Sequence, residues 1–577
     1  MREYLRAAVV SAAALALFGC SPGGDGNNGQ ATAVIAPGSA DWQAFVDRTI
    51  ERWFTLDPAF AVYQGRHDFD GKLPDWSDAG LKARADFLKV TIREAGRFRD
   101  LTPQQRFERD YLAKVAEGQL FWLEDADQPH RNPAFYIGGL DPNVYVARNY
   151  ADPATRLQAL TRFLKGVPGA VEQIKANLKL PLPVSFVDYG VAGFRGFADY
   201  YTGDAKAAFA EVKDPTLQRE FDAAAMAAAK ATRGLGDWLE ASKADATTDF
   251  ALGPERFARM LKATEAVDIS LDALERVGRA DLARNQAMLR AECAKLAPGK
   301  SIAQCMGEIN AIKPEGGPVA AARRQIPELR AFLIEKDLVT IPGTEEALVR
   351  ESPPYNRQNS AYIDPPGPFE KNIPSIYYIS PPDPSWSPAV QAAYIPGEPD
   401  LLFTTVHEVF PGHFLQFLHA NRSESLFGRL FVGYAFAEGW AHYTEEMMWE
   451  AGLRGTPETH IGQLSNALLR NCRFLSAIGL HARGMTQAQS QAMFRDECFQ
   501  DEGNARQQAA RGTYDPAYLN YTLGKLMIRK LRADWTAKNG GREAWKGFHD
   551  RFLSYGGPPI PLVRQAMMNE DTPRALF

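Results

Sequence analysis

Residues 404–416 read T-T-V-H-E-V-F-P-G-H-F-L-Q, and residues 437–447 read A-E-G-W-A-H-Y-T-E-E-M. These two stretches place His407, His413 and Glu438 in one short part of a chain that has only nine histidines. Two imidazoles and a carboxylate are the protein ligands of a catalytic zinc site, in which water takes the fourth position. We therefore predict that these three residues hold one zinc ion, and we expect the fold to be built around it.

The spacing of the two histidines requires a break in the helix that carries them. In the H-E-x-x-H motif of metalloproteases, the histidines are four residues apart on one helix face. His407 and His413 are six residues apart, which on a regular helix separates them by about 120° and roughly 9 Å. Pro411 removes a helical hydrogen bond, and Gly412 tolerates unusual dihedral angles. We predict that the helix breaks here and brings the two rings together. Glu408, next to the first histidine, is the expected general base.

The second stretch is expected to form a helix over residues 431–450. Glu438, His442 and Glu445 are separated by four and three residues, so they share one helix face. Glu438 is the expected third ligand, and Glu445 suits a hydrogen-bond partner for a ligating imidazole. Three roles are open for His442: replacing Glu438 as ligand, binding substrate, or orienting Glu438. Glu446 is expected to be a charge that faces solvent.

The helix that carries the two histidines is apolar on nearly all sides, which predicts that it is buried. A single buried histidine usually bonds a carbonyl group. Two histidines and two glutamates in an apolar pair of helices are different, because their charge is costly to bury and a divalent ion offsets that cost. The alternative is that the six-residue spacing holds no metal, so that these side chains form a hydrogen-bonded network.

Four stretches of the sequence resemble the signatures of one bacterial family. They are H-E-V-F-P-G-H at 407–413, E-G-W-A-x-Y at 438–443, Y-x-x-G-x-L-x-I at 521–528 and G-R-H-D-F-D-G-K-L-P-D-W-S at 65–77. The chain thereby resembles, over nearly all of its mature length, the family designated domain of unknown function 885, whose motif is H-E-x-x-P-G-H. The resemblance implies a large, mostly α-helical fold with a central cleft, similar to zinc oligopeptidases of the thimet and angiotensin-converting kind. It implies zinc-metallopeptidase-like chemistry but indicates no substrate.

Further residues are candidates for the cleft. A phenol aimed at a zinc-bound oxyanion stabilises a tetrahedral intermediate, and Tyr521 is the candidate because it occupies the family-like position. The alternative is a core tyrosine whose hydroxyl is satisfied. His442 is a second candidate for steadying the oxyanion. Arg473 lies on a different helix face from Leu468 and Leu475, and it either binds a substrate carboxylate in the cleft or forms a surface salt bridge.

The N-terminus resembles a bacterial lipoprotein signal. Residues 1–20 contain two arginines, an apolar run too short to span a bilayer, and a cysteine at the cleavage point. We predict a lipoprotein signal peptide over 1–20 with a lipid on Cys20; the alternative is plain secretion with Cys20 removed. Residues 21–40 are expected to be a flexible tether, and 41–577 a single α-helical metallopeptidase-like domain. Ser21 favours the outer membrane, so we expect a cell-envelope protein that faces the periplasm and contacts the membrane only through its lipid.

The composition is that of an ordinary soluble protein, with 23% charged and 45% apolar residues and a net charge of −5. Nothing is basic enough to indicate nucleic-acid binding, and no second stretch reaches transmembrane length. The sequence does not indicate an oligomeric state. In an oxidising compartment, Cys293 with Cys305 and Cys472 with Cys498 are candidate disulfides. Neither pair has the C-x-x-C spacing of metal ligands, so the alternative is buried thiols.

Helical periodicity dominates the rest of the chain. It predicts helices over 41–56, 154–178, 205–242 and 257–296, and again from 463, with two more between 81 and 119 that are separated at Thr102 and Pro103. Residues 351–400 are too rich in proline for long helices. There, residues 375–380 are predicted to form an edge strand that pairs with an extended substrate; the alternative is a crossover between two helical halves. The expected fold class is mostly α, with minor β in short edge strands.

Together these features predict a zinc-dependent hydrolase of peptide or related amide bonds, with peptides as substrates. Glu408 is expected to take a proton from the attacking water and pass it to the leaving amine. One alternative is an amidase that acts on cell-wall or small-molecule substrates with the same ligands. Another is a tethered binding protein that retains the fold without chemistry, which Glu408 disfavours because a structural zinc site needs no free carboxylate.

Overall fold

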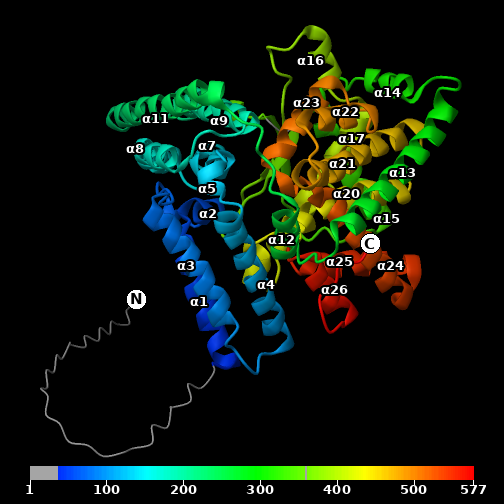
Figure 1. Cartoon of the computed structure of the whole chain (residues 1–577), viewed down its shortest axis with the longest axis horizontal. Coiled ribbons are helices and arrows are strands. Elements are labelled where there is room, and N and C mark those ends of the chain that lie inside the picture. Colours follow the sequence, from blue (N-terminus) through cyan, green and yellow to red (C-terminus); the bar gives the residue numbers. More distant parts are fainter. Residues whose placement is uncertain (1–36, 358–359) are drawn as a thin grey trace, which may run out of the picture.

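The computed structural model describes residues 37–357 and 360–577, and Figure 1 shows their arrangement. The expected signal peptide over 1–20, with Cys20, and residues 21–36 of the expected tether lie outside the described residues. Within the described ranges, no helix is both long enough and apolar enough to cross a membrane. Helices dominate and one small sheet supplies the strands, which confirms the predicted fold class.

The part of the chain before residue 243 is a group of helices that packs at the left in Figure 1. They are α1 (Ser39–Leu56), α2 (Pro58–Tyr63), α3 (Asp78–Ala95), α4 (Pro103–Leu120), α5 (Gln128–Arg131), α6 (Ala134–Ile137), α7 (Asn143–Ala147), α8 (Pro153–Asn177), α9 (Val184–Thr202), α10 (Asp204–Ala208) and α11 (Pro215–Ser242). The predicted separation of α3 and α4 is confirmed. The Thr102 hydroxyl accepts a hydrogen bond from the Gln105 N–H, and Pro103 begins the helix, where its missing N–H costs nothing.

The later helices surround the sequence stretch that carries the histidines. They are α12 (Pro254–Glu265), α13 (Leu271–Leu296), α14 (Ile302–Ala311), α15 (Pro318–Lys336), α16 (Pro388–Tyr394), α17 (Glu398–Glu408), α18 (His413–Ala420), α19 (Leu426–Leu430), α20 (Tyr434–Glu450), α21 (Pro457–Ala482), α22 (Gln487–Asp496), α23 (Glu502–Tyr514), α24 (Asn520–Asn539), α25 (Trp545–Ser554) and α26 (Ile560–Met568).

The apolar faces of these helices form two hydrophobic cores. One core is built mainly from α1 to α11 and also contains Tyr355, Phe427 and Leu430 from the later part of the chain. The other is built from α12 onwards and contains Phe121 and Ala126 from the earlier part. Each core therefore holds side chains from both parts of the sequence, which ties the two parts together.

The proline-rich segment forms the small sheet, with strand order β1 (Ala347–Glu351), β3 (Ser375–Ile379), β2 (Ala361–Asp364). The strand expected at residues 375–380 exists, but its expected edge position is wrong. β3 pairs with β1 in parallel and with β2 antiparallel, and all its residues are buried. Its continuous apolar character is that of a strand covered on both sides. The two edge strands of this sheet are β1 and β2.

Both candidate disulfides are present. Cys293–Cys305 connects α13 to α14, and Cys472–Cys498 connects α21 to the segment that follows α22. The alternative of buried thiols is therefore excluded. The second bridge matters for the site, because α21 forms one of its walls.

Candidate metal centre

The helix that carries the first histidine breaks where the sequence predicts. α17 ends at Glu408 and α18 begins at His413. Because the chain turns back between them, the ring centroids of His407 and His413 are only 4.8 Å apart, with their planes nearly perpendicular at 89°. The six-residue spacing thus brings the two imidazoles together.

Two contacts hold the turn between α17 and α18. The Gly412 N–H donates a hydrogen bond to the Val406 carbonyl, at 3.0 Å. The indole N–H of Trp440, in α20, donates to the Pro411 carbonyl, at 2.8 Å. The second contact ties the turn to the helix that supplies the expected third ligand.

The three expected ligands converge on one point. His407 Nε2 and His413 Nε2 each lie 3.1 Å from Oε2 of Glu438. Within the described chain, these residues are the only group of His, Cys, Asp or Glu side chains that could hold a metal ion, with ligand atoms within 4.8 Å of one another. Burial alone raises the pKa of Glu438, but the two imidazoles hold that pKa well below its usual range. The carboxylate is therefore ionised.

The hydrogen bonding of His407 fits a bound cation. Its Nδ1–H donates to Oε1 of Glu445, at 2.7 Å, because a carboxylate only accepts. In the neutral ring, Nε2 then carries a lone pair that faces the Glu438 carboxylate. Two acceptor atoms this close require a positive charge between them, from a proton or a metal ion. With His413 Nε2 facing the same oxygen, the set is two nitrogens and one oxygen, which suits zinc.

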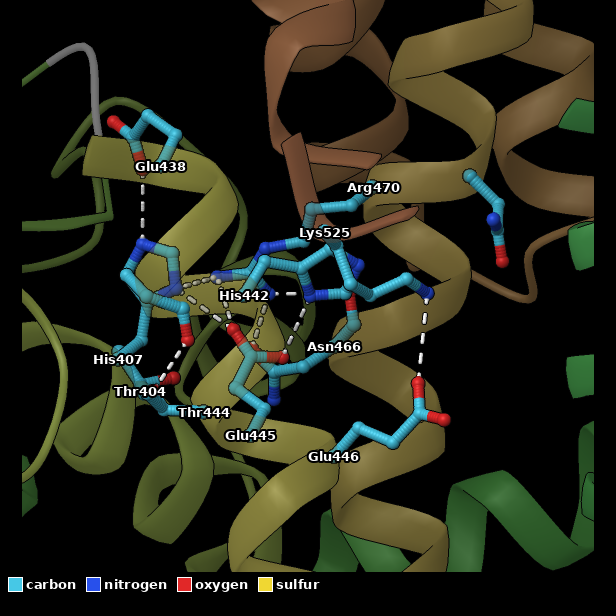
Figure 2. A network of polar contacts seen from close by, with 12 residues as sticks. Thr404, His407, Glu438, His442, Thr444, Glu445, Glu446, Asn466, Arg470 and Lys525 are labelled. Carbon is cyan, nitrogen blue, oxygen red and sulfur yellow. Dashed lines mark hydrogen bonds and ion pairs between the residues drawn. The ribbon is translucent and has the colours of Figure 1, made fainter. Parts of the chain in front are cut away.

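Glu445 contacts the His407 ring at Nδ1, the nitrogen that does not face Glu438 (Figure 2). It is fully buried and accepts hydrogen bonds from His407 and from His442 Nδ1–H, the latter at 3.2 Å. The Arg470 guanidinium lies 3.4 Å from its Oε1. Burial raises the pKa of Glu445, but Arg470, His442 and His407 hold it far below its usual range. An ionised carboxylate thus fixes the His407 ring, as is usual for a ligating imidazole.

The His442 side chain lies outside the cavity and outside the group of His407, His413 and Glu438, where an oxyanion partner or a ligand would have to be. Its side chain is entirely buried, it does not line the cavity at the site, and its Nδ1–H points to Glu445. Burial and the charge of Lys525 lower the pKa of His442 to about 4, so it is neutral. The structure places it behind Glu445, where it supports the His407 ring indirectly.

Glu408 faces a cavity of about 820 Å³, whose walls also include His407, His413 and Glu438. Only 5% of Glu408 is exposed, and its Oε2 has no hydrogen-bond partner among the described residues. Burial raises the pKa of Glu408 despite the nearby imidazoles. A buried carboxylate with a free oxygen beside the ligands has the position expected of a general base. The edge strand β2 lines the same cavity.

Tyr521 lies against the ligands, in the cavity wall. Its ring stacks on His407 with centroids 6.0 Å apart and an interplanar angle of 19°. Its hydroxyl accepts a hydrogen bond from Arg511 Nη2 at 3.4 Å. Burial raises the pKa of Tyr521, so the phenol keeps its proton for donation. The expected position of Tyr521 in the cleft thus agrees with the structure.

The sequence interpretation missed Arg470 in the cavity wall and misplaced Glu446. Arg470 and Arg473, both in α21, line the cavity. For Arg473 this agrees with the cleft position that was one of its two expected roles, whereas Arg470 was not a candidate, and its signal was an arginine within a mostly apolar helix. Glu446 is buried rather than solvent-facing, because Arg284 pairs with it at 2.9 Å. Lys525 lies 3.8 Å from the same carboxylate (Figure 2). The two partners of Glu446 come from α13 and α24, and no local sequence pattern reveals them.

Two solved structures share this fold. A "putative lipoprotein of unknown function" from Shewanella oneidensis matches with a TM-score of 0.73 and 25% identity, over 91% of this chain and 99% of that one. A "putative lipoprotein" from Colwellia psychrerythraea matches with a TM-score of 0.77 and 17% identity, over 92% of this chain and 98% of that one. No curated protein matches the chain.

The family resemblance seen in the sequence is confirmed by a match to a family profile. The profile described as "Bacterial protein of unknown function (DUF885)" matches residues 58–567, a range that contains all three converging ligands, Glu408 and Tyr521. This chain belongs to the DUF885 family.

Proposed function

We propose that this protein is a metal-dependent hydrolase of peptide or related amide bonds, with zinc as the metal. The observation that carries the proposal is the convergence of His407 Nε2, His413 Nε2 and Glu438 Oε2 in the wall of a large cavity. Three protein ligands beside a cavity leave a position for water or substrate, as in catalytic zinc sites. Glu408 lies next to them with a free carboxylate oxygen.

In this proposal, Glu408, Tyr521 and Glu445 each have a separate role in hydrolysis. A bound zinc ion supplies Lewis acidity at the scissile carbonyl and at the attacking water. Glu408 accepts the proton of that water and donates it to the leaving amine. Tyr521 donates a hydrogen bond to the oxygen that becomes negative in the tetrahedral state. Glu445 keeps His407 in one tautomer, so that its Nε2 stays available as a ligand.

We also propose that the protein is a lipoprotein of the cell envelope that faces the periplasm, attached through Cys20 at the outer membrane. The sequence of residues 1–20 supports this. The two disulfides support an oxidising compartment. The two structural neighbours bear the description "putative lipoprotein".

The test combines metal content with turnover. We expect about one zinc per wild-type chain and hydrolysis of members of a peptide and amide library. His413→Ala should lose the zinc. Glu408→Gln should keep the zinc and lose turnover by at least about 100-fold. His419→Ala is the matched control, because His419 is also in α18 but donates from Nε2 to the Thr340 carbonyl, at 2.8 Å, and it should retain both.

Distinct failures point to distinct alternatives. Wild-type protein that binds no zinc, even after zinc is added, would contradict the metal site and leave a hydrogen-bonded network. Zinc-loaded protein that cleaves nothing in the library would contradict the hydrolase and favour a binding protein. Cleavage of cell-wall or small-molecule amides alone would replace peptides by those substrates.

A further inference from the structure

Arg473 is a buried cation in the cavity wall without an anionic partner. Only 6% of it is exposed, and it lines the cavity that contains the three ligands. Its Nε–H donates to the amide oxygen of Gln508 at 2.8 Å. No carboxylate of the described chain forms an ion pair with it. Burial and the neighbouring guanidinium groups of Arg511 and Arg470 lower the pKa of Arg473, so its surroundings favour an added anion.

The other arginines of the cavity wall each have an acidic partner. Arg470 lies 3.4 Å from the buried carboxylate of Glu445. The Arg511 Nε lies 3.0 Å from Asp515, and Arg495, at the exposed rim, lies 2.8 Å from Asp496. Among the described residues, Arg473 is therefore the cavity arginine whose charge is uncompensated. A buried charge without a partner is costly, and an anionic ligand removes that cost.

The position of Arg473 limits where such an anion lies relative to the proposed reaction. Its Cζ lies 4.5 Å from the centroid of the Tyr521 ring, and the His407 ring lies 6.0 Å from the same centroid. The guanidinium and the metal ligand are therefore separated by at most the length of about three residues of extended chain. An anion at Arg473 belongs to a group close to the scissile bond.

We propose that Arg473 binds the free C-terminal carboxylate of the substrate, so that the enzyme cleaves within about three residues of a chain end. This inference rests on the proposed function. Gln508 occupies Nε, which leaves the two terminal nitrogens of the guanidinium for the two oxygens of a carboxylate. That end-on pairing is a geometry that arginine favours. Substrates are then short peptides or acyl amino acids with a free carboxylate, and internal bonds of proteins are excluded.

The first measurement is binding to protein that does not turn over. N-acetyl-trialanine and its C-terminal amide are titrated into full-length Glu408→Gln protein by calorimetry. We expect the acid to bind roughly 10- to 100-fold more tightly than the amide. In the Glu408→Gln protein, a second substitution Arg473→Gln should abolish the preference for the acid over the amide. Arg473→Lys in its place should keep part of that preference, because lysine retains the charge and loses the planar fork. Adding Arg495→Gln, the matched control at the rim, should leave the preference unchanged.

The second measurement is the ratio of kcat/KM for acid and amide substrates, which is taken within one protein and so does not depend on the folded fraction. Arg473→Gln should lower this ratio roughly 10- to 100-fold, mainly through KM for the acid. Equal binding of acid and amide by the parent protein, binding of neither, or an unchanged ratio in Arg473→Gln would overturn the proposal. The proposal would also be overturned if chloride stabilised the protein through Arg473 and the protein showed no preference for the acid over the amide. Acid-selective, Arg473-dependent binding in a protein that hydrolyses nothing would sustain the carboxylate site while refuting the hydrolase.

Discussion

At the scale of single residues, Gly412 decides whether the two histidines meet. A Cβ atom built there would lie 1.7 Å from the His407 carbonyl oxygen and 2.5 Å from that of Val406. This close backbone approach is a requirement for glycine at position 412. Any larger side chain must push the turn away from the end of α17.

We therefore expect Gly412→Ala to move His413 away from His407, to lose zinc binding, and to lower the free energy of unfolding by several kcal/mol. Zinc content and denaturant unfolding measure the two effects. Gly169→Ala is the matched control: a Cβ at this glycine in α8 meets nothing within 4 Å, and alanine in an exposed helix position is neutral or mildly stabilising. A Gly412→Ala protein with wild-type stability and zinc content would contradict this account of the turn.

Glu265 is a buried carboxyl group outside the site that makes stability depend on pH. Only 1% of it is exposed; it accepts hydrogen bonds from Asn520 Nδ2 at 3.0 Å and from the Ala435 N–H at 3.4 Å. Burial raises the pKa of Glu265 to about 8, from 4.5. Between these two values the folded state holds a proton that the unfolded chain has released. Stability from this group is therefore highest below about pH 4.5 and falls as pH rises to about 8.

Glu265→Gln should remove this decline while keeping an acceptor for both hydrogen bonds. The free energy of unfolding of the variant, relative to that of the wild type, should therefore increase from pH 5.5 to pH 8.5, by an amount on the order of a few kcal/mol. Urea unfolding at the two pH values gives the difference. Glu255→Gln, at an exposed position of the same helix, is the control and should leave the pH dependence unchanged. Parallel pH curves for wild type and Glu265→Gln would contradict the raised pKa.

At the scale of elements, the second disulfide anchors one wall of the cavity. Cys472–Cys498 closes a loop of 26 residues from the middle of α21 to the segment after α22. The same helix carries Arg470 and Arg473, whereas the three proposed ligands lie on α17, α18 and α20. The bridge thus holds the wall that carries the arginines and not the ligands.

Replacing Cys472 and Cys498 together by serine should lower the free energy of unfolding by about 2–4 kcal/mol, because the unfolded chain gains freedom. Zinc content should stay at the wild-type value, because no proposed ligand is on α21. Denaturant unfolding and zinc analysis of the same preparation give both numbers. The matched comparison is the Cys293 and Cys305 double replacement, which opens a loop of 12 residues. Loss of zinc in the first variant alone would show that α21 also positions the ligands.

At the scale of the whole molecule, Arg148 joins the N-terminal helices to the strand that lines the cavity. It follows α7, is 2% exposed, and pairs with Asp364 of β2 at 2.6 Å and with Glu370 at 2.8 Å. It also donates hydrogen bonds to the carbonyls of Tyr63 and Pro365, both at 2.8 Å. One guanidinium thus compensates two largely buried carboxylates and connects segments more than two hundred residues apart in sequence.

Arg148→Met should destabilise the protein by about 3–5 kcal/mol, because it leaves Asp364 and Glu370 as uncompensated charges. Denaturant unfolding measures this effect. Arg195→Met is the matched control: its ion pair with Asp237 is solvent-exposed, and such pairs contribute at most about 1 kcal/mol. Equal losses in the two variants would show that the Arg148 network does not connect the two parts of the molecule.

The sequence alone indicated many of the helices, the start of α4 and the break in the site helix, because periodicity, caps and proline act over a few residues. Thr102 caps α4 as predicted, and α17 ends before Pro411. It also indicated the proposed ligands, because His407, His413 and Glu438 lie in two short stretches close to each other in the chain. The existence of β3 followed from its composition.

Only the tertiary structure decided what surrounds these side chains. Adjacent Glu445 and Glu446 face different partners, His407 and Arg284 respectively, because each partner comes from another helix. For the same reason, the central position of β3 depended on strands before it. Likewise, the missing counter-charge at Arg473 is visible only once every neighbour is in place. Charges meet across elements distant in sequence, and no local pattern specifies which of them will be paired.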